Sequence, residues 1–377
     1  MPSSETLKPL IKYTGGKYKE YKFFKEHIPS TVNDYYEPFF GGGGVFFRMH
    51  SDNIISGHSY INDISTDLMN FYSSITKKEF IEELYKLVDV WGDVLTLGTS
   101  INEKYGELFL NVIHNENTID EFLTDSFRSW LEEEIAGMSH LSEYNTHGYS
   151  LCDKIIDGLK SKMQRFIMKN ISFEEEDVSF RCITTSVCQS FYFTVREMYN
   201  EWLLNPSAPY TETEKSVQWF FIREFCFGSM FRFGGDGKFN VPYGGFSYNK
   251  KCLRSKVNEI AKDKTQRIFS KTKIFSQDFD KFMKRKFQTN DFMFLDPPYD
   301  ATFSEYDNNS FTRNDHIRLK ERLDNIKCKW LIVLRKTDFI SELYKDYPQI
   351  EFNKTYSYQA RGTYDSKKSI HLIIKNY

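Results

Sequence analysis

The chain has 377 residues, 40% of them hydrophobic and 27% charged, which is enough apolar material for one large core or two ordinary ones. It contains no apolar run of the roughly 18 residues that a membrane span needs, and Met1–Glu5 lacks a signal-peptide pattern, so we expect a cytoplasmic protein without a membrane partner. A net charge of −2 excludes no class of partner, and six cysteines without a Cys-x-x-Cys pair predict reduced thiols and no metal site.

The chain divides into three parts by pattern. Residues from about 10 to 75 show short apolar strands separated by glycine and aspartate, as in an α/β nucleotide-binding domain. Residues from about 76 to 270 are mostly helical and include a hairpin-like stretch, Phe227–Tyr248, rich in glycine and aromatic residues. Residues 271–377 return to strands. The clearest expected helices are Lys77–Val90, Ile119–Ala136 and Ser190–Leu204, and the expected late strands are Lys273–Ser276, Phe292–Leu295, Trp330–Leu334, Glu351–Tyr358 and Ser369–Lys375.

This pattern predicts a split catalytic α/β domain, 1–75 with 271–377, into which a mainly helical domain, 76–270, is inserted. Charge is distributed unevenly in the middle of the chain. Glu79–Glu134 has 14 acidic and 3 basic residues, whereas Lys250–Lys286 has 13 basic and 4 acidic residues. Such asymmetry favours a basic face for phosphates and an acidic surface turned away from them. The alternative is a set of solvated helices that differ in charge.

A glycine-rich loop, Gly41–Gly44, follows the first predicted strand and precedes a helix that opens with Val45. Glycines permit positive φ and close approach of the backbone to a ligand. A P-loop would need Gly-Lys-Ser/Thr at the helix start, and a dinucleotide loop would need a glycine at Phe46. Because neither pattern is present, the loop suits a ligand without phosphates.

Asp63 ends the next predicted strand, twenty residues after Gly43. A carboxylate in this place accepts hydrogen bonds from ribose hydroxyls. A nucleoside without phosphates indicates S-adenosylmethionine as the cofactor. The loop by itself could be a plain turn, but the loop and Asp63 together favour the cofactor site.

Asp296-Pro297-Pro298-Tyr299 directly follows the apolar run Phe292–Leu295. Prolines cannot continue a hydrogen-bonded ladder, so the strand must end there, and residues beyond the carboxyl end of such a strand line the ligand crevice of an open α/β sheet. The alternative is that these residues have no catalytic role and form only a turn that ends the strand, with Asp296 capping a helix.

The tetrapeptide also suits one reaction, methylation of an exocyclic amine. The amine of adenine is a poor nucleophile because its lone pair is conjugated with the ring. Asp296 and the carbonyl of Pro297 can accept its two N–H groups and localise that pair, and the proline fixes the orientation of its carbonyl in advance. Tyr299 offers a flat face on which an extruded base can stack.

Four segments together resemble the Dam-type, or alpha-group, D12 class of DNA adenine-N6 methyltransferases. They are Lys12-Tyr13-Thr14-Gly15-Gly16-Lys17, Glu37-Pro38-Phe39-Phe40-Gly41-Gly42-Gly43, Ile61-Asn62-Asp63-Ile64 and Phe294-Leu295-Asp296-Pro297-Pro298-Tyr299. The resemblance implies a Rossmann-like methyltransferase sheet, transfer of a methyl group from S-adenosylmethionine to N6 of a flipped adenine in double-stranded DNA, and a target-recognition role for the inserted domain.

The resemblance also implies roles for individual residues. The cofactor would be bound by Tyr13, Lys17, Glu37, Phe39, Gly41, Gly43, Asp63, Asp278, Phe279 and Asp296. Catalysis would fall to Asp296, Pro297 and Tyr299. Phe227–Phe233 with Gly237–Gly244 resembles the DNA-reading hairpin of the family, which places Arg232 at a guanine-contacting position. DNA would be contacted by Lys12, Met230, Arg232 and Asn240. Ser310-Phe311-Thr312 and the ending 362–375 also resemble the family.

Several alternatives remain open at this point. Cytosine-N4 methylation uses the same amine chemistry, although that group usually carries Ser before Pro-Pro-Tyr, and a DNA-binding module without catalysis is a second possibility. RNA or protein methylation is a third, which the hairpin with Arg232 disfavours. Residues 90–188 have no clear counterpart in the family, and we interpret them as an extra helical elaboration on the target-recognition domain that serves self-association, a partner or packing alone. A cognate restriction endonuclease is a further expected partner, with the protein located at nucleoid or viral DNA.

Overall fold

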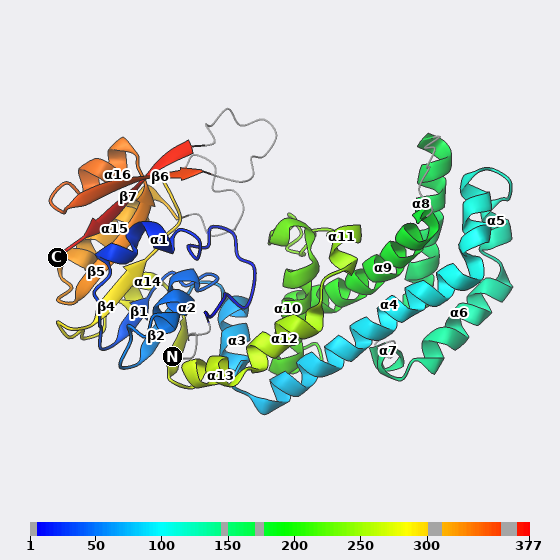
Figure 1. The fold of residues 1–377 in the computed structure, drawn as a ribbon, viewed down its shortest axis with the longest axis horizontal. Coiled ribbons are helices and arrows are strands. Elements are labelled where there is room, and N and C mark those ends of the chain that lie inside the picture. The colour runs from blue at the N-terminus through cyan, green and yellow to red at the C-terminus, as the bar shows by residue number, and fades with distance from the viewer. Residues whose placement is uncertain (1–5, 145–149, 170–176, 301–310, 356–367) are drawn as a thin grey trace. The chain divides into compact units, whose positions relative to one another are not determined.

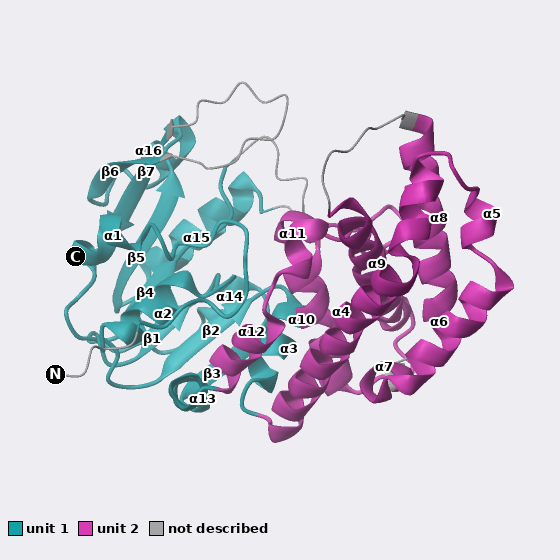
Figure 2. Ribbon diagram, turned by 45° about the vertical axis from the view of Figure 1, so that its right-hand side comes forward, with its two compact units in different colours: residues 1–76, 262–377 teal, residues 77–261 magenta. Residues whose placement is uncertain are grey.

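The structure is a computed structural model that describes residues 6–144, 150–169, 177–300, 311–355 and 368–377. The chain divides into two compact units (Figure 2). Unit 1 comprises residues 1–76 and 262–377 and is an α/β domain, and unit 2 comprises residues 77–261 and is built from helices. Ser310 and residues 362–367 of the family-like segments lie outside the described residues.

Unit 1 is organised around a seven-stranded sheet with the order β3-β2-β1-β4-β5-β7-β6 (Figure 1). The strands are β1 (Tyr35–Glu37), β2 (Ser59–Asp63), β3 (Thr272–Ser276), β4 (Phe292–Leu295), β5 (Lys329–Arg335), β6 (Gln349–Thr355) and β7 (Lys368–Lys375). Neighbouring strands from β3 to β5 are parallel, whereas β7 is antiparallel to both β5 and β6. This sheet confirms the Rossmann-like α/β class expected from the sequence.

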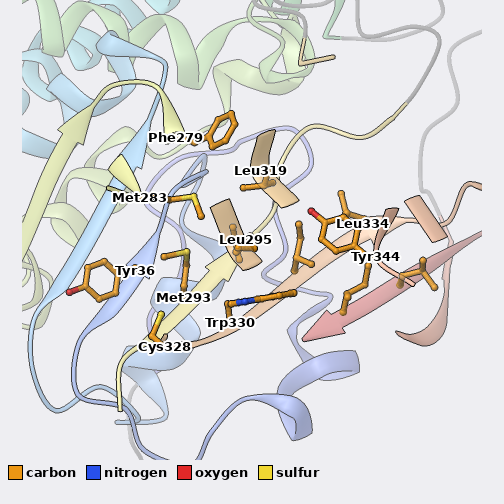
Figure 3. Packing of buried hydrophobic residues seen from close by; sticks show 14 of the residues in the cluster. Tyr36, Phe279, Met283, Met293, Leu295, Leu319, Cys328, Trp330, Leu334 and Tyr344 are labelled. Carbon is orange, nitrogen blue, oxygen red and sulfur yellow. The ribbon is translucent and has the colours of Figure 1, made fainter. Parts of the chain in front are cut away.

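The central strands are apolar on both faces because helices cover both sides of the sheet. Met293 and Leu295 of β4 join Trp330 of β5 in one buried cluster (Figure 3). The alternate residue Phe294 points to the opposite face, where its ring stacks on Phe24 at a centroid distance of 5.4 Å. Burial of both faces therefore explains why the sequences of β4 and β5 are continuous apolar runs.

The helices of unit 1 connect these strands. They are α1 (Tyr21–Phe24), the 3-10 turn Lys25–His27, α2 (Gly44–Ser51), α3 (Thr66–Ser74), α13 (Asp263–Ser270), α14 (Phe279–Phe282), α15 (Arg313–Asp324) and α16 (Asp338–Leu343). The sequence pattern assigned residues 262–270 to the middle of the chain, but α13 belongs to unit 1. The reason is packing, because Phe269 of α13 stacks on Tyr72 and contacts Phe46 and Phe47.

Unit 2 is dominated by two long helices that pack together, α4 (Lys78–Ile113) and α9 (Val178–Leu204). The remaining elements are α5 (Ile119–Phe122), α6 (Asp125–Gly137), α7 (Ser139–Tyr144), α8 (Leu151–Lys169), α10 (Glu212–Phe225), the 3-10 turn Phe227–Ser229, α11 (Phe246–Asn249) and α12 (Leu253–Ala261). The single helix expected over Ile119–Ala136 is two helices, because Thr118 and Thr124 each cap a new helical start.

The acidic and basic stretches of the sequence are not separate surfaces throughout. Within unit 2, Arg254 of the basic stretch donates to Asp89 of the acidic stretch at 2.7 Å, and Tyr85 donates to Asn258 at 3.0 Å. Helix α12 thus packs on α4. The expectation of an acidic surface turned away from a basic one is therefore wrong where these two helices meet.

The stretch Phe227–Tyr248 turns back on itself without forming regular strands. Its two sides meet at isolated antiparallel bridges, Cys226 with Tyr243 and Phe233 with Phe239. Gly228 and Ser229 both have positive φ, and such residues interrupt a ladder. The expected β-hairpin is therefore an irregular hairpin-shaped loop.

Other expectations concern the whole chain. All six cysteines are free thiols. Within the described ranges, no cluster of three or more His, Cys, Asp or Glu residues is arranged to hold a metal ion. The helices in those ranges are all too short or too polar to cross a membrane.

Candidate active site

The candidate site lies at the carboxyl ends of β1 and β4, the two strands at which the strand order of the sheet reverses. In open α/β sheets such a switch point opens the crevice in which ligands bind. Strand β1 leads into the glycine loop, and β4 leads into Asp296. The topology therefore brings the two sequence motifs to one edge of the sheet.

Lys17 connects the parts of the tetrapeptide. Its Nζ donates to Asp296 Oδ1 at 2.6 Å, to the Tyr299 hydroxyl at 2.7 Å and to the Gly15 carbonyl at 3.3 Å. The Lys17 side chain is only 2% exposed and that of Asp296 is 19% exposed. A buried charge pair of this kind is held tightly, because neither partner can turn to water without leaving the other unpaired.

The charges of this pair support each other. Burial raises the pKa of the Asp296 carboxyl, and the ammonium of Lys17 opposes that shift. Burial alone would lower the pKa of Lys17, but Asp296, Tyr299 and Glu20 outweigh it, so the pKa of Lys17 is raised. Burial, followed by the charge of Asp296, raises the pKa of Tyr299. The site thus holds an ammonium and a neutral phenol beside the carboxyl group of Asp296.

A second ion pair and a histidine lie beside this group. Lys354 Nζ donates to Glu20 Oε1 at 2.7 Å, and both side chains are largely buried. The imidazole of His371 meets the Tyr299 ring edge-on at a centroid distance of 5.3 Å. Burial, Lys354 and Lys17 lower the pKa of His371 to about 3, so the ring is neutral and adds no charge to the site.

The glycine loop is shaped by the ring of Tyr13. A Cβ atom at Gly41 would stand 3.0 Å from that ring, and one at Gly42 would stand 2.8 Å from the Tyr13 Cβ. Gly41 and Gly43 adopt positive φ, of 50° and 66°. The loop therefore requires glycine for its conformation and for the close contact with Tyr13.

Asp63 and Asn62 brace this loop from the end of β2. The Asp63 carboxylate accepts from Gly41 N at 2.9 Å and from Ser65 N at 3.0 Å. Buried Asn62 donates to the Pro38 and Gln277 carbonyls and accepts from Gln277 N. Sequence reasoning named Asp63 but missed Asn62, although an amide next to the end of an otherwise apolar strand was the available signal.

Aromatic rings form one wall of unit 1 near the loop. Phe39 contacts Phe279 at 5.4 Å and Phe311 at 5.6 Å between ring centroids. Asp278 caps α14 by accepting from Asp280 N, and it also accepts from Arg318 at 3.0 Å. The structure therefore places Phe39 and Phe279 together, whereas the carboxylate of Asp278 is engaged by α14 and α15.

Glu37 is turned into the core. It is 2% exposed and accepts from the Tyr35 hydroxyl at 2.7 Å. Burial raises its pKa well above the ordinary value. Glu37, one of the expected cofactor residues, thus braces β1, and the charges of Asp296 and Asp63 add to the rise in its pKa.

The expected DNA-contacting residues of unit 2 lie in the hairpin-shaped loop. Arg232 is exposed, and its Nε donates to Asn240 Oδ1 at 3.4 Å. Met230 is 38% exposed and Phe227 is 48% exposed. Lys12, the fourth expected DNA contact, is an exposed residue of unit 1. The loop thus presents a cation together with apolar side chains to solvent.

Comparison with known proteins gives a consistent picture. A family model described as the D12 class of N6-adenine-specific DNA methyltransferases matches residues 13–155 and 159–358. The expectation that residues 90–188 have no counterpart in the family is therefore wrong, because the match runs through them apart from residues 156–158. The type II methyltransferase M.CviBI of Paramecium bursaria Chlorella virus NC1A is 25% identical over 376 residues, which is 98% of this chain and 100% of the relative.

Two further relatives match different fractions of this chain. The type II methyltransferase M1.LlaDCHI of Lactococcus lactis subsp. cremoris is 22% identical over 98% of this chain and 96% of its own length. The retron Ec67 DNA adenine methylase of Escherichia coli is 26% identical over 41% of this chain and 52% of its own length.

Proposed function

Since this chain belongs to the D12 class of N6-adenine-specific DNA methyltransferases and thus methylates adenine in DNA, we propose that Asp296, Pro297 and Tyr299 carry out the transfer. Cytosine-N4 methylation and a module without catalysis are accordingly disfavoured. The observation that carries the proposal is the buried Asp296 carboxylate at the end of β4, held by Lys17 at 2.6 Å.

Asp296 and Pro297 activate the adenine amine. Lys17 binds Oδ1 of Asp296, so we assign one amine N–H to Oδ2 and the other to the Pro297 carbonyl. Two acceptors fixed before the substrate arrives localise the nitrogen lone pair without reorganisation during the reaction. The carboxylate, whose pKa burial raises, is also suited to accept the proton that the amine loses after methylation.

Tyr299 and Lys17 orient the base and the carboxylate. The Tyr299 hydroxyl accepts from Lys17, and the edge of His371 supports its ring, so the flat face has a fixed direction for stacking on an extruded adenine. Lys17 is the positioning residue, because it opposes the rise in the pKa of the Asp296 carboxyl and sets the rotation of both side chains.

We propose S-adenosylmethionine as the methyl donor, bound at the glycine loop. The residues present fit such a group: Gly41 and Gly42 leave no room for a side chain beneath Tyr13, and Asp63 stands at the loop with lone pairs suited to ribose hydroxyls. Phe39 and Phe279 offer apolar faces to an adenine ring, and Tyr13 offers a π face to a sulfonium. The cofactor supplies an activated methyl group, so the chain needs no metal for the transfer.

Unit 2 is proposed as the target-recognition domain. The Nη1–Nη2 edge of Arg232 suits guanine O6 and N7 in the major groove, with Asn240 orienting the guanidinium through Nε. Met230 and Phe227 supply exposed apolar contacts to bases or sugars. The names of the full-length relatives further support a type II modification enzyme that protects DNA from a cognate endonuclease at the host or viral DNA.

One experiment tests this function directly. Purified protein is incubated with double-stranded DNA and S-adenosylmethionine, and the DNA is digested to nucleosides for mass spectrometry. We expect N6-methyl-2′-deoxyadenosine to accumulate, with the methylated sequence read from the same DNA by single-molecule sequencing. N4-methylcytosine, or methylation of RNA alone, would contradict the proposal.

A further inference from the structure

The first turn of α15 anchors the residue that follows the tetrapeptide. Thr312 caps this helix by accepting from Asp315 N, and Asp315 in turn accepts from Thr312 N at 2.8 Å. Arg313 then donates from Nε to Asp300 Oδ1 at 3.0 Å and from Nη2 to Oδ2 at 3.2 Å. Thr337, the cap of α16, also donates to Asp300 at 3.2 Å. Three donors from two helix starts thus surround this carboxylate.

His316 lies one helical turn after Arg313, on the same face of α15. Its side chain is fully buried between Phe311, at a centroid distance of 4.8 Å, and Phe339, at 6.2 Å. Burial lowers the pKa of His316, while Asp300, Asp315 and the nearby Pro298 carbonyl oppose that shift. A neutral imidazole carries one N–H donor, and neither ring nitrogen of His316 makes a hydrogen bond of full length and angle.

A buried N–H needs an acceptor, because leaving it unpaired is costly. The Pro298 carbonyl adjoins this ring. The backbone of Pro297 and Pro298 also lacks N–H groups, so the segment cannot be held by donors of its own. Donors from elsewhere must fix this segment, and α15 supplies two of them. His316 lies beside the Pro298 carbonyl, and Arg313 holds the carboxylate of the next residue but one, Asp300.

We propose that His316 is a positioning residue for methyl transfer, which donates to the Pro298 carbonyl and, with the Arg313–Asp300 pair, fixes the backbone that presents the Pro297 carbonyl to the amine. This inference rests on the proposed catalytic role of Asp296 and Pro297. His316 also connects the residues assigned to the cofactor with those assigned to catalysis. Phe311 contacts His316 on one side and Phe39 and Phe279 on the other, so the rings assigned to the cofactor touch the support of the catalytic loop.

The decisive comparison is between His316→Leu, which removes the donor and keeps an apolar side chain, and His316→Gln, which keeps a donor. Single-turnover methylation of double-stranded DNA with saturating S-adenosylmethionine isolates the chemical step from product release. We expect His316→Leu to lower this rate roughly 10- to 100-fold, since small misplacement of a reacting group has effects of this size. The apparent affinities for DNA and cofactor should change less than about twofold, and His316→Gln should restore most of the rate.

A matched control separates positioning from general loss of packing. His50 is a half-buried histidine of α2 that pairs with Ser59 at 3.0 Å, away from the tetrapeptide. We expect His50→Leu to leave the single-turnover rate unchanged. Equal rate losses in His50→Leu and His316→Leu, or a folded His316→Gln as slow as His316→Leu, would overturn the proposal.

Arg313 provides a second variant in case His316→Leu does not fold, because its side chain is 64% exposed. Arg313→Met should lower the single-turnover rate several-fold, whereas Lys320→Met, which removes the Lys320–Asp324 pair of the same helix, should not. An unchanged rate in Arg313→Met would overturn the proposal. Full activity in Asp296→Asn would instead show that the catalytic assignment itself is wrong, whatever the His316 variants do.

Discussion

Asp296 in unit 1 and Arg232 in unit 2 are held in opposite ways. Asp296 is largely buried and is bound by Lys17, which also binds Tyr299 and Gly15. Arg232 is exposed in an irregular loop, where its contact with Asn240 is a long one of 3.4 Å. The side chain of Asp296 is thus fixed by other side chains before any substrate arrives, whereas Arg232 has a long side-chain contact in an exposed loop.

This difference indicates how methyl transfer and the proposed sequence recognition can vary independently. Methylation needs one geometry, so a dense network around Asp296 lowers the reorganisation that the transition state demands. Sequence recognition is proposed for the exposed loop, and a surface loop can change side chains without disturbing a core. Substitutions in the first region should therefore abolish the reaction, and substitutions in the second should change its target.

The largest effect is expected for Asp296→Asn. The amide keeps the shape but loses the negative charge, so methyl transfer should fall on the order of 10³-fold or more. Binding of S-adenosylmethionine, measured by calorimetry, should persist. The exposed Asp324→Asn serves as the matched control and should retain full activity. An active Asp296→Asn enzyme would show that the buried region does not carry the chemistry.

Lys17→Met should have the next largest effect, with the turnover rate falling about 100-fold. Lys17 opposes the burial-driven rise in the pKa of Asp296, so its loss raises that pKa further. The carboxylate is then protonated at a higher pH, and the acid limb of the pH–rate profile should move upward. Lys25→Met, which removes an exposed pair with Asp52, should leave the profile in place.

Arg232→Ala should relax the choice of base at one guanine, with a loss of discrimination of about 1–3 kcal/mol. Methylation rates on a library of sites measure this change. Lys238→Ala in the same exposed loop should instead weaken binding evenly across sequences. A site preference that Arg232→Ala leaves intact would move the recognition role to other residues.

The smallest effect concerns stability and the buried His371. Its pKa falls from the ordinary 6.5 to about 3 in the folded chain. Between these values the unfolded chain binds a proton that the folded chain does not, so stability declines as the pH falls through this window. His371→Phe should make the melting temperature less sensitive to pH between 7 and 5, while the exposed His58→Phe should not.

Much of the α/β architecture and the place of the tetrapeptide could be inferred from sequence because each has a local cause. Apolar runs such as Phe292–Leu295 mark buried parallel strands, and the prolines after Asp296 mark the end of one. The glycine loop and Asp63 likewise stand at strand ends, where the topology brings them together.

The rest depended on contacts that sequence spacing does not reveal. Lys17 and Asp296 are 279 positions apart, so nothing local indicates their pairing. Helix α13 carries many charged residues, as its neighbours do, and long-range contacts such as those of Phe269 with Tyr72 and of Gln266 with the Ile75 carbonyl place it in unit 1. The roles of the two units in DNA recognition and the side-chain assignments remain predictions that the variants above test.

The strand order has a consequence for how the protein is made. Strand β1 pairs with β4, as Tyr35 does with Phe292, so the centre of the sheet joins segments that leave the ribosome far apart in time. All of unit 2 is synthesised between them and can begin to fold first, because domains generally fold as units during synthesis. The sheet is completed only after Asp296 emerges, so nascent chains that can already form the hairpin-shaped loop of unit 2 cannot yet modify DNA.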